Sequence, residues 1–505
     1  MRTLISLSGA LALAMSVWTA PADAGKSDDT LNVAFGADFE NVDPYLGATR
    51  QGITIAHHVF DGLLFRDPDD FEYKPNLAKS YKWVDTVTID FELRQGVKFH
   101  NGEKFDADDV VFTLNYVTRP DVGNRSPHLV EWIKNAEKLG EYKVRVHLKR
   151  AFGAALDYFG LPVRIYPNTY FNKVGPEGFI RKPVGTGPYK VAEIVPGKSV
   201  TLVKNDNLFA GSQKSGATIR TIKFRIIPER NTQIAELISR GLDWIWRVPQ
   251  DQAGKLETMS GITVVRGETL RIGAISFDVK GISGKSPLQN LQVRKAIAHA
   301  INRQAIRDNL VKGSSRVIHA ACHPAQFGCT DDVTKYEYDP NKAKKLLVDA
   351  GYPNGFEIDL YSWSPRQRVE AVIGDLRKVG IRANPQILQN PAVRKKLLAH
   401  EVPFLQFNWG SDSVADAIAS AGVFFRFGHY DIAQDGQVRD WLNQATGTVV
   451  VAERKALYKK ALQKIADQAY MLPISTWVTN YAISADLGFK PSLDEYPRFY
   501  RSRWK

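Results

Sequence analysis

Apolar residues recur at every second position in several short segments of the chain. In segment 89–93, which reads IDFEL, apolar and polar side chains alternate, and segment 31–35 is a mainly apolar run that breaks into a polar loop. Alternation is typical of a strand with one buried face, and a short apolar run is typical of a strand buried on both faces. Asn101 and Gly102 then predict a tight turn. These segments predict β-structure in the first part of the chain.

Other segments place apolar residues three or four positions apart, as a helix with one buried face requires. Asp106 is a predicted N-cap, with Asp109 at the third position of the amphipathic helix that follows. Asp339 and Pro340 predict the start of another helix, which Gly351 ends before a strand. These signals predict two helices, each with a defined start.

Strands and helices alternate along the chain. Residues 220–245 are predicted to form a strand, a helix ended by Gly241 and a second strand. Residues 293–305 carry apolar side chains at spacing four and predict one continuous helix that Gly313 closes. This alternation favours an α/β fold with parallel sheets covered by helices, at least in the second half. Because no long proline- or serine-rich linker is present, we expect the domains to join through strands.

The length of the chain requires more than one domain. A single hydrophobic core usually stops growing at roughly 250 to 300 residues, and this chain has 505. With 44% hydrophobic, 24% charged and 11% aromatic residues, the composition is that of a globular protein and excludes a disordered one.

The first 24 residues predict a secretory signal peptide. Arg2 precedes an apolar stretch too short to span a membrane, and Ala22 and Ala24 form an A-x-A cleavage pair. The alternative is a buried N-terminal helix. Cleavage after Ala24, with no cysteine there to carry a lipid, predicts a soluble periplasmic protein that is not a lipoprotein.

The two cysteines, Cys322 and Cys329, lie seven positions apart. In an oxidising compartment they most simply form one local disulfide, which contributes about 2.5 kcal/mol to stability in the chain-entropy model. With His319 and His323 beside them, a metal site is the alternative. Zinc sites normally bring a second closely spaced ligand pair, so we predict the disulfide and no metal.

The chain carries a formal net charge of +13. Its lysines and arginines are spread along the sequence and form no run of five or more, whereas a nucleic-acid footprint would cluster on one element. The charge therefore predicts a basic solvated surface and no nucleic-acid partner.

Four segments occur in a characteristic order: LRQGVKFHNGEKFDADDVVFTL, PVGTGPYKV, VRKAIAHAINRQAI and YEYDPNKAKKLLVDAGYP. Together they resemble the signature segments of the family-five extracellular solute-binding proteins. These are exported receptors that deliver dipeptides, oligopeptides, nickel chelates and some sugars to ABC importers. The resemblance spans roughly residues 30 to 480.

The resemblance implies a two-lobed α/β fold, the type II periplasmic binding protein fold, with the ligand cleft between the lobes. The first lobe would comprise residues 25–272 and 483–505, with an extra subdomain at 58–180, and the second lobe residues 273–482. The crossing strands would lie near RIGAISFDV and PISTWVTNYAIS, which independently have the pattern of strands.

The resemblance also implies a binding site in the stretch WGSDSVAD, residues 409–416. In peptide-binding members a strand ends in tryptophan, and an aspartate three positions later takes the α-ammonium group of the ligand. Trp409, Ser411 and Asp412 match this arrangement. The alternative is that Asp412 caps a helix beginning near Val414. Asp416 is interpreted as a first-turn acid of that helix rather than a ligand contact.

Two departures from the family pattern argue against an ordinary free dipeptide. First, no Asp-Pro or Glu-Pro pair follows Asp412. Second, the loop LYSWSPRQ has Trp363 where dipeptide binders carry an arginine for the ligand carboxylate. Arg366 comes only at the start of the helix that follows. Trp363 and Trp409 could instead sandwich an apolar or planar ligand.

The segment GADF occupies the family's first-lobe contact loop, so Asp38 and Phe39 are further candidates for ligand contacts. The alternative for this segment is a plain surface turn.

Enzyme motifs are absent from the sequence. Each of its three GKS triplets lacks the earlier glycine of a P-loop, and neither H-E-x-x-H nor G-x-S-x-G occurs. His57, His58 and His100 are interpreted as surface or structural residues rather than metal ligands. The sequence thus predicts a monomeric receptor, without cofactor, that captures a peptide-like or amine-bearing solute for the permease of an ABC importer. A nickel chelate, an oligosaccharide and an opine-like compound remain alternatives, and an exported hydrolase is a remote one.

Overall fold

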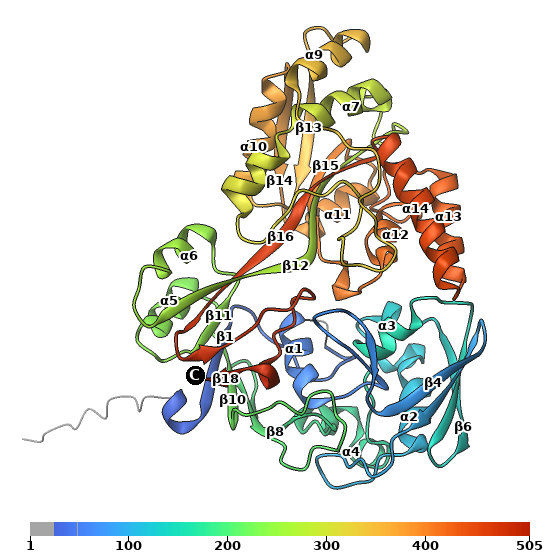
Figure 1. Cartoon of the computed structure of the whole chain (residues 1–505), viewed down its shortest axis with the longest axis vertical. Helices are drawn as coiled ribbons and strands as arrows, with labels where there is room; N and C mark the ends of the chain where they lie inside the picture. Colours follow the sequence, from blue (N-terminus) through green and yellow to red (C-terminus); the bar gives the residue numbers. More distant parts are fainter. Residues whose placement is uncertain (1–24, 48) are drawn as a thin grey trace, which may run out of the picture.

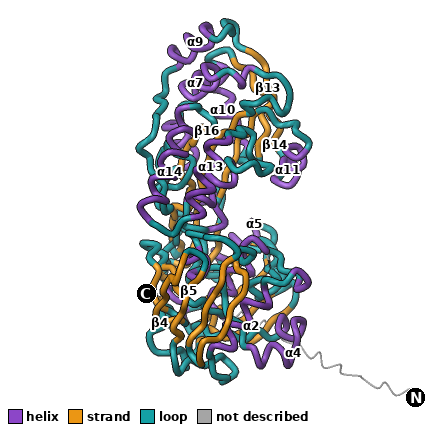
Figure 2. Tube along the Cα trace, turned by 90° about the vertical axis from the view of Figure 1, so that its right-hand side faces the viewer, coloured by secondary structure: helices purple, strands orange, loops and turns teal. Residues whose placement is uncertain are grey.

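The computed structural model describes residues 25–47 and 49–505, so the predicted signal peptide lies outside the described residues. The chain forms two lobes, and the long strands β12 (Ile262–Phe277) and β16 (Met471–Ser484) run between them (Figures 1 and 2). The predicted two-lobed α/β fold is therefore confirmed, and the two stretches expected to cross between the lobes are these strands.

One ten-stranded sheet extends through both lobes, in the order β14-β13-β15-β12-β16-β11-β1-β10-β9-β8. Its first-lobe strands are β1 (Thr30–Phe35), β8 (Tyr189–Val195), β9 (Ser199–Lys204), β10 (Thr221–Ile226) and β11 (Trp244–Trp246). Its second-lobe strands are β13 (Phe356–Ser362), β14 (Ile381–Ile387) and β15 (Phe404–Trp409). Because β12 and β16 pair with each other along most of their length, backbone hydrogen bonds join the lobes directly.

Both faces of this sheet are buried. In β1, Val33 and Phe35 belong to the main core of the first lobe, whereas Ala34 faces a smaller cluster on the other side. In β15, Leu405 and Phe407 pack on one side and Phe404 on the other. Successive side chains of a strand point to opposite faces, so one short apolar run serves two cores.

The first lobe contains a second sheet within the segment predicted as an extra subdomain. This sheet has the order β4-β5-β7-β6, and its strands are β4 (Ala78–Asp85), β5 (Thr88–Leu93), β6 (Ile133–Gly140) and β7 (Lys143–Leu148). The remaining short strands are β2 (Leu64–Arg66), β3 (Tyr73–Pro75), β17 (Leu487–Gly488) and β18 (Arg503–Trp504). The lobe limits at residues 272 and 482 fall within β12 and β16 and stay predictions.

The helices of the first lobe are α1 (Arg50–Val59), α2 (Ala107–Val117), α3 (Ala155–Gly160), α4 (Asn168–Arg181), α5 (Arg230–Ile238) and α6 (Gln250–Leu256). Those of the second lobe are α7 (Leu291–Ala300), α8 (Arg303–Ile306), α9 (Pro340–Asp349), α10 (Arg366–Arg377), α11 (Asn390–Leu398), α12 (Ala421–Phe424), α13 (Gly436–Gly447) and α14 (Val451–Asp467). The predicted starts hold: Asp106 and Asp109 form a capping box on α2, and the Asp339 side chain caps α9.

Two predictions of local structure were wrong. The single helix expected over 293–305 is broken, because Ile301 is extended and the Asn302 side chain accepts from the backbone N–H of Ala305 to begin α8. The large sheet is mixed rather than parallel: β13 runs parallel to β14 and β15, but β12 is antiparallel to both of its neighbours.

Cys322 and Cys329 form the predicted disulfide, with their Cα atoms 5.9 Å apart. The loop that this bond closes contacts the predicted binding loop. The Gln326 amide donates to the backbone carbonyls of Val414 and Asp416 at 2.9 and 3.2 Å. The disulfide therefore restrains the segment against which residues 414–416 are held.

Replacing both cysteines with serine should lower the free energy of unfolding by about 2.5 kcal/mol, because the unfolded chain regains the entropy of the seven-residue loop. Urea denaturation under non-reducing conditions measures the loss. Reducing agent should destabilise the wild type by a similar amount and leave the double variant unchanged. Equal stability of the variant and the oxidised wild type would contradict this expectation.

Candidate ligand-binding cleft

The predicted binding loop follows β15 and turns sharply. Ser411, Asp412 and Ser413 have φ angles of 54°, 45° and 64°, all in the left-handed region. Non-glycine residues rarely adopt this conformation, and it costs on the order of 1–3 kcal/mol for each residue. Contacts outside the loop must therefore hold the turn in place.

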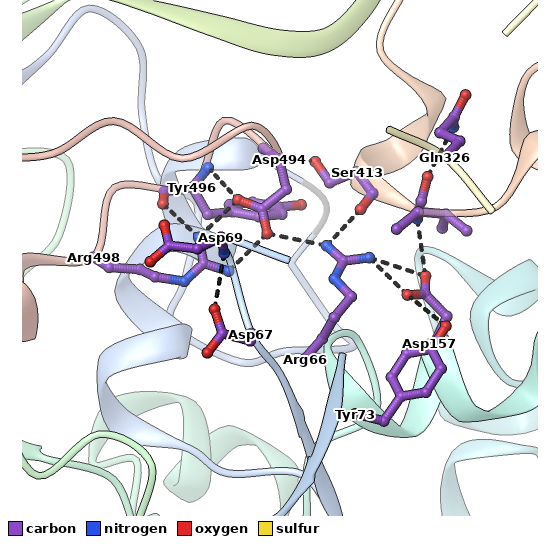
Figure 3. Close-up of polar contacts among 12 residues, drawn as sticks. Arg66, Asp67, Asp69, Tyr73, Asp157, Gln326, Ser413, Asp494, Tyr496 and Arg498 are labelled. Atoms are coloured by element: carbon purple, nitrogen blue, oxygen red, sulfur yellow. Dashed lines mark hydrogen bonds and ion pairs between the residues drawn. The ribbon is translucent and has the colours of Figure 1, made fainter. Parts of the chain in front are cut away.

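Arg66, at the end of β2 in the first lobe, supplies the main contact. Its guanidinium is fully buried, bonds both carboxylate oxygens of Asp157 at 2.9 Å and donates to the backbone carbonyl of Ser413 at 2.7 Å (Figure 3). It also pairs with Asp494 at 3.0 Å. One first-lobe arginine thus fixes the backbone of a second-lobe loop.

The same cluster restrains the loop at further points. The Asp157 carboxylate accepts from the backbone N–H of Ala415 at 3.1 Å, and the Val414 side chain belongs to the core of the first lobe. Asp494 also pairs with Arg498 at 2.6 Å (Figure 3). Burial would raise the pKa of Asp494, but the two guanidiniums, that of Arg498 above all, hold this pKa far below its usual value.

Asp412 lies at the tip of the turn with its side chain 61% exposed. It lines a hollow of about 200 Å³ together with Arg50, Arg164 and Tyr496 of the first lobe. His128 Nε2 lies 3.9 Å from its carboxylate, which accepts no hydrogen bond from any residue in the described part of the chain. Asp412 does not cap a helix, so its oxygens are available to a donor in the hollow.

Asp416 is a structural residue, but it caps a turn rather than lying in the first turn of a helix beginning near Val414. Its side chain accepts from Ile418 N at 3.0 Å and so caps a single 3₁₀ turn, Ala417–Ala419. It also pairs with Arg454 and accepts from the Tyr458 hydroxyl at 2.6 Å. These buried contacts leave it with no free face toward a solute.

The two predicted tryptophans belong to one aromatic cluster, in which both contact Tyr430. Each indole ring centroid is 5.8 Å from that of Tyr430. Trp409 donates its indole N–H to Ala419 O at 2.7 Å, and Trp363 donates to Asn408 O at 3.0 Å. Trp363 also lines a shallow hollow with Trp477. A solute sandwiched between Trp363 and Trp409 stays a prediction.

The remaining predicted site residues differ in exposure. Asp38 is exposed and accepts from Glu40 N at 3.0 Å. Phe39 is 1% exposed and packs in the core of the first lobe, and Ser411 is also buried, with a hydroxyl that has no hydrogen-bond partner among the described residues. In this conformation Phe39 and Ser411 present almost no surface to the cleft, so their roles as contacts stay predictions.

The histidines expected to be structural are held by the backbone. His58 contacts Thr54 O through Nδ1 at 2.8 Å and accepts from Phe499 N at Nε2, and His100 contacts Gly187 O at 3.0 Å. Both are tied into the first lobe. Within residues 25–47 and 49–505, no three histidine, cysteine or acidic side chains gather in a way that could hold a metal ion.

A second hollow, of about 570 Å³, was not predicted from the sequence. It lies where the lobes meet, and its lining includes Arg247, Arg271, Arg368, Trp477 and Glu495. These residues come from the end of β11, from β12, α10 and β16, and from the C-terminal segment. In the sequence they are scattered over more than two hundred positions, and no local motif links them.

Glu495 organises this hollow. Its carboxylate pairs with Arg271 at 3.1 Å and with Arg50 at 3.7 Å, while Arg271 also donates to the Asn408 side chain at 2.8 Å. Burial would raise the pKa of Glu495, but Arg271 and Arg50 outweigh it and lower the pKa to about 2. Arg50 lines the Asp412 hollow, so the Arg50–Glu495 pair links the two hollows.

Comparison with known proteins places this cleft in a family. Residues 72–429, more than half of the chain, match the model of the bacterial extracellular solute-binding proteins, family 5 Middle. The chain belongs to this family. The resemblance seen in the four sequence segments is therefore confirmed, and the family consists of solute-binding proteins rather than enzymes.

Individual relatives cover most of the chain. Heme-binding protein A of Haemophilus influenzae is 26% identical over 88% of this chain and 86% of its own length. Glutathione-binding protein GsiB of Salmonella paratyphi A is 30% identical over 74% of this chain and 72% of its own length. The solved structure of HbpA2 from Haemophilus parasuis shares the fold, with a TM-score of 0.81 and 23% identity over 94% of this chain and all of that one.

The Arg66 cluster should dominate stability. Replacing Arg66 with methionine leaves Asp157 buried without its cation and should lower the free energy of unfolding by about 3–5 kcal/mol. Replacing Arg145, which pairs with Asp90 nearer the surface of the same lobe, should lower the free energy of unfolding far less, because solvent screens that pair. Urea denaturation compares the two variants, and equal losses would argue against a special role for Arg66.

Glu495 should make stability depend on pH. Its folded pKa of about 2 lies below the ordinary 4.5, so its contribution is fully present above pH 4.5 and is lost as the pH falls toward 2. The stability difference between the wild type and Glu495→Gln should therefore shrink from pH 6 to pH 3, as measured by urea denaturation. Glu370→Gln removes one partner of an exposed ion pair and is the control, and its stability difference from the wild type should stay the same over this pH range. A constant difference for Glu495→Gln would contradict the assignment.

Proposed function

We propose that this protein is an exported receptor that captures a short peptide-like solute with a free amine and delivers it to the permease of an ABC importer. Family membership supports the receptor role. The proposal places the mature chain in the periplasm, as a monomer, after cleavage behind Ala24. No helix in the described ranges 25–47 and 49–505 combines the length and apolarity needed to cross a membrane.

One observation carries the choice of solute. Asp412 presents to a hollow lined by residues of both lobes a carboxylate that accepts no hydrogen bond from the described residues, on a backbone fixed by buried contacts. An ammonium group of a bound solute would donate charge-assisted hydrogen bonds to it, and closure of the lobes would strengthen them by excluding water. Because its position is fixed before binding, little entropy is lost in ordering it.

The relatives support a solute of peptide size. The name of GsiB states that it binds glutathione, which is a tripeptide, and this relative is 30% identical to the chain. Arg50 and Arg164 lie in the same hollow as Asp412, so a zwitterionic end group would find both charges matched there.

Replacing Asp412 with asparagine should weaken the binding of trialanine by roughly 30-fold or more, since the charge pair with the ammonium group, which closure of the lobes would bury, is lost. Isothermal titration calorimetry measures the change. Asp332→Asn, an 80% exposed aspartate of the same lobe, is the matched control and should bind like the wild type.

Two observations would contradict the assignment. One is that N-acetyl-trialanine, which lacks the amine, binds the wild type as tightly as trialanine. The other is that protein purified gently from the periplasm retains a solute without an amine, as identified by native mass spectrometry.

A further inference from the structure

The arginine-lined hollow lies beside the Asp412 hollow and is lined by three arginines, against two around Asp412. Its three arginines are contributed by separate parts of the molecule: Arg247 follows β11 in the first lobe, Arg271 lies on the crossing strand β12, and Arg368 belongs to α10 in the second lobe. Closure of the lobes would bring all three around one bound group.

Arg368 lies over an aromatic ring. Its guanidinium carbon lies 3.4 Å from the centre of the Trp477 ring, and it makes no ion pair or side-chain hydrogen bond within the part of the chain that the structure describes. Burial lowers the pKa of Arg368 to about 10. Stacking uses the face of the guanidinium and leaves the N–H groups along its edge free, which is the geometry that binds a carboxylate with two hydrogen bonds.

Arg247 repeats this arrangement from the other lobe. Its guanidinium stacks on Trp246 at 4.6 Å and likewise pairs with no acid among residues 25–47 and 49–505. Its backbone has a φ of 55°, a strained conformation for a residue with a side chain. The strain turns the chain at the end of β11, where the arginine reaches the hollow.

The acids in this hollow do not balance its arginines. Glu495 is already shared between Arg271 and Arg50. Asp251 is the other acid in the lining, and it is exposed and forms no ion pair within the described ranges. Arg247 lies near enough to Glu495 to help lower its pKa, but neither Arg247 nor Arg368 forms a salt bridge within the described residues. The three arginines of the lining outnumber its two acids, so the hollow has an excess of positive charge.

We propose that this hollow is an anion subsite and that the solute is an acidic short peptide, with a second carboxylate besides its C-terminal one. The inference rests on the proposed function, because it assumes that the amine of the same solute lies at Asp412. Asn408 lines the arginine hollow, and Asp412 lines the other hollow. These residues are four positions apart, so their Cα atoms are separated by at most about 14 Å. A tripeptide has a comparable length, so its two ends can reach both hollows.

The test uses three peptides of nearly equal shape: Ala-Ala-Glu with two carboxylates, Ala-Ala-Gln with one, and the amide of Ala-Ala-Gln with none. Calorimetry on the full mature chain should give affinities that fall in this order. Arg368→Gln should weaken the binding of Ala-Ala-Glu on the order of 30-fold or more, and it should weaken the binding of the amide far less. Arg366→Gln, on the same helix but exposed and paired with Glu370, is the matched control and should change neither.

Each outcome decides one point. Equal affinity for all three peptides, or no binding of Ala-Ala-Glu at millimolar concentration, would overturn the anion subsite. Equal affinity for Ala-Ala-Glu and Ala-Ala-Gln would contradict the proposal that the solute carries a second carboxylate. A further outcome is that N-acetyl-Ala-Ala-Glu binds as tightly as Ala-Ala-Glu while the amide of Ala-Ala-Gln still binds weakly. That result would contradict the role of Asp412 as the amine contact and would support the anion subsite.

Discussion

The buried guanidinium of Arg66 is the contact on which the arrangement of the cleft depends. It joins a helix of the first lobe, through Asp157, and the C-terminal segment, through Asp494, to the backbone of the second-lobe loop. Three consecutive left-handed residues are unfavourable on their own, and the fixed carbonyl of Ser413 and N–H of Ala415 hold them in this conformation. Asp412 owes its position to this cluster, although it makes no contact with Arg66.

The continuous sheet explains how residues of both lobes share one cleft. Strands β12 and β16 belong to each lobe, and they carry Arg271 and Trp477. Side chains on such strands keep their places relative to one another because backbone hydrogen bonds fix the register. Arg247 and Arg368, by contrast, lie on opposite lobes, so their separation depends on how far the cleft is closed.

The two hollows differ in which of their charged side chains are engaged in strong ion pairs. In the arginine hollow, Glu495 forms salt bridges with Arg271 and Arg50, and Arg247 and Arg368 form none within the described residues. In the other hollow, Asp412 remains exposed beside arginines. A solute with an amine at one end and carboxylates at the other matches this asymmetry, which is the electrostatic complementarity that gives binding proteins their specificity.

The sequence by itself determined the two-lobed α/β fold, the crossing strands, the starts of α2 and α9 and the local disulfide, because each depends on residues close together in the chain or on an ordered set of motifs. It did not determine the break at Ile301, where one asparagine side chain competes with the helix, or the antiparallel neighbours of β12. Nor did it reveal the arginine hollow, whose residues lie on both lobes. Only tertiary packing brings them together, because charge pairing and stacking depend on distance in space and leave no period or spacing in the chain.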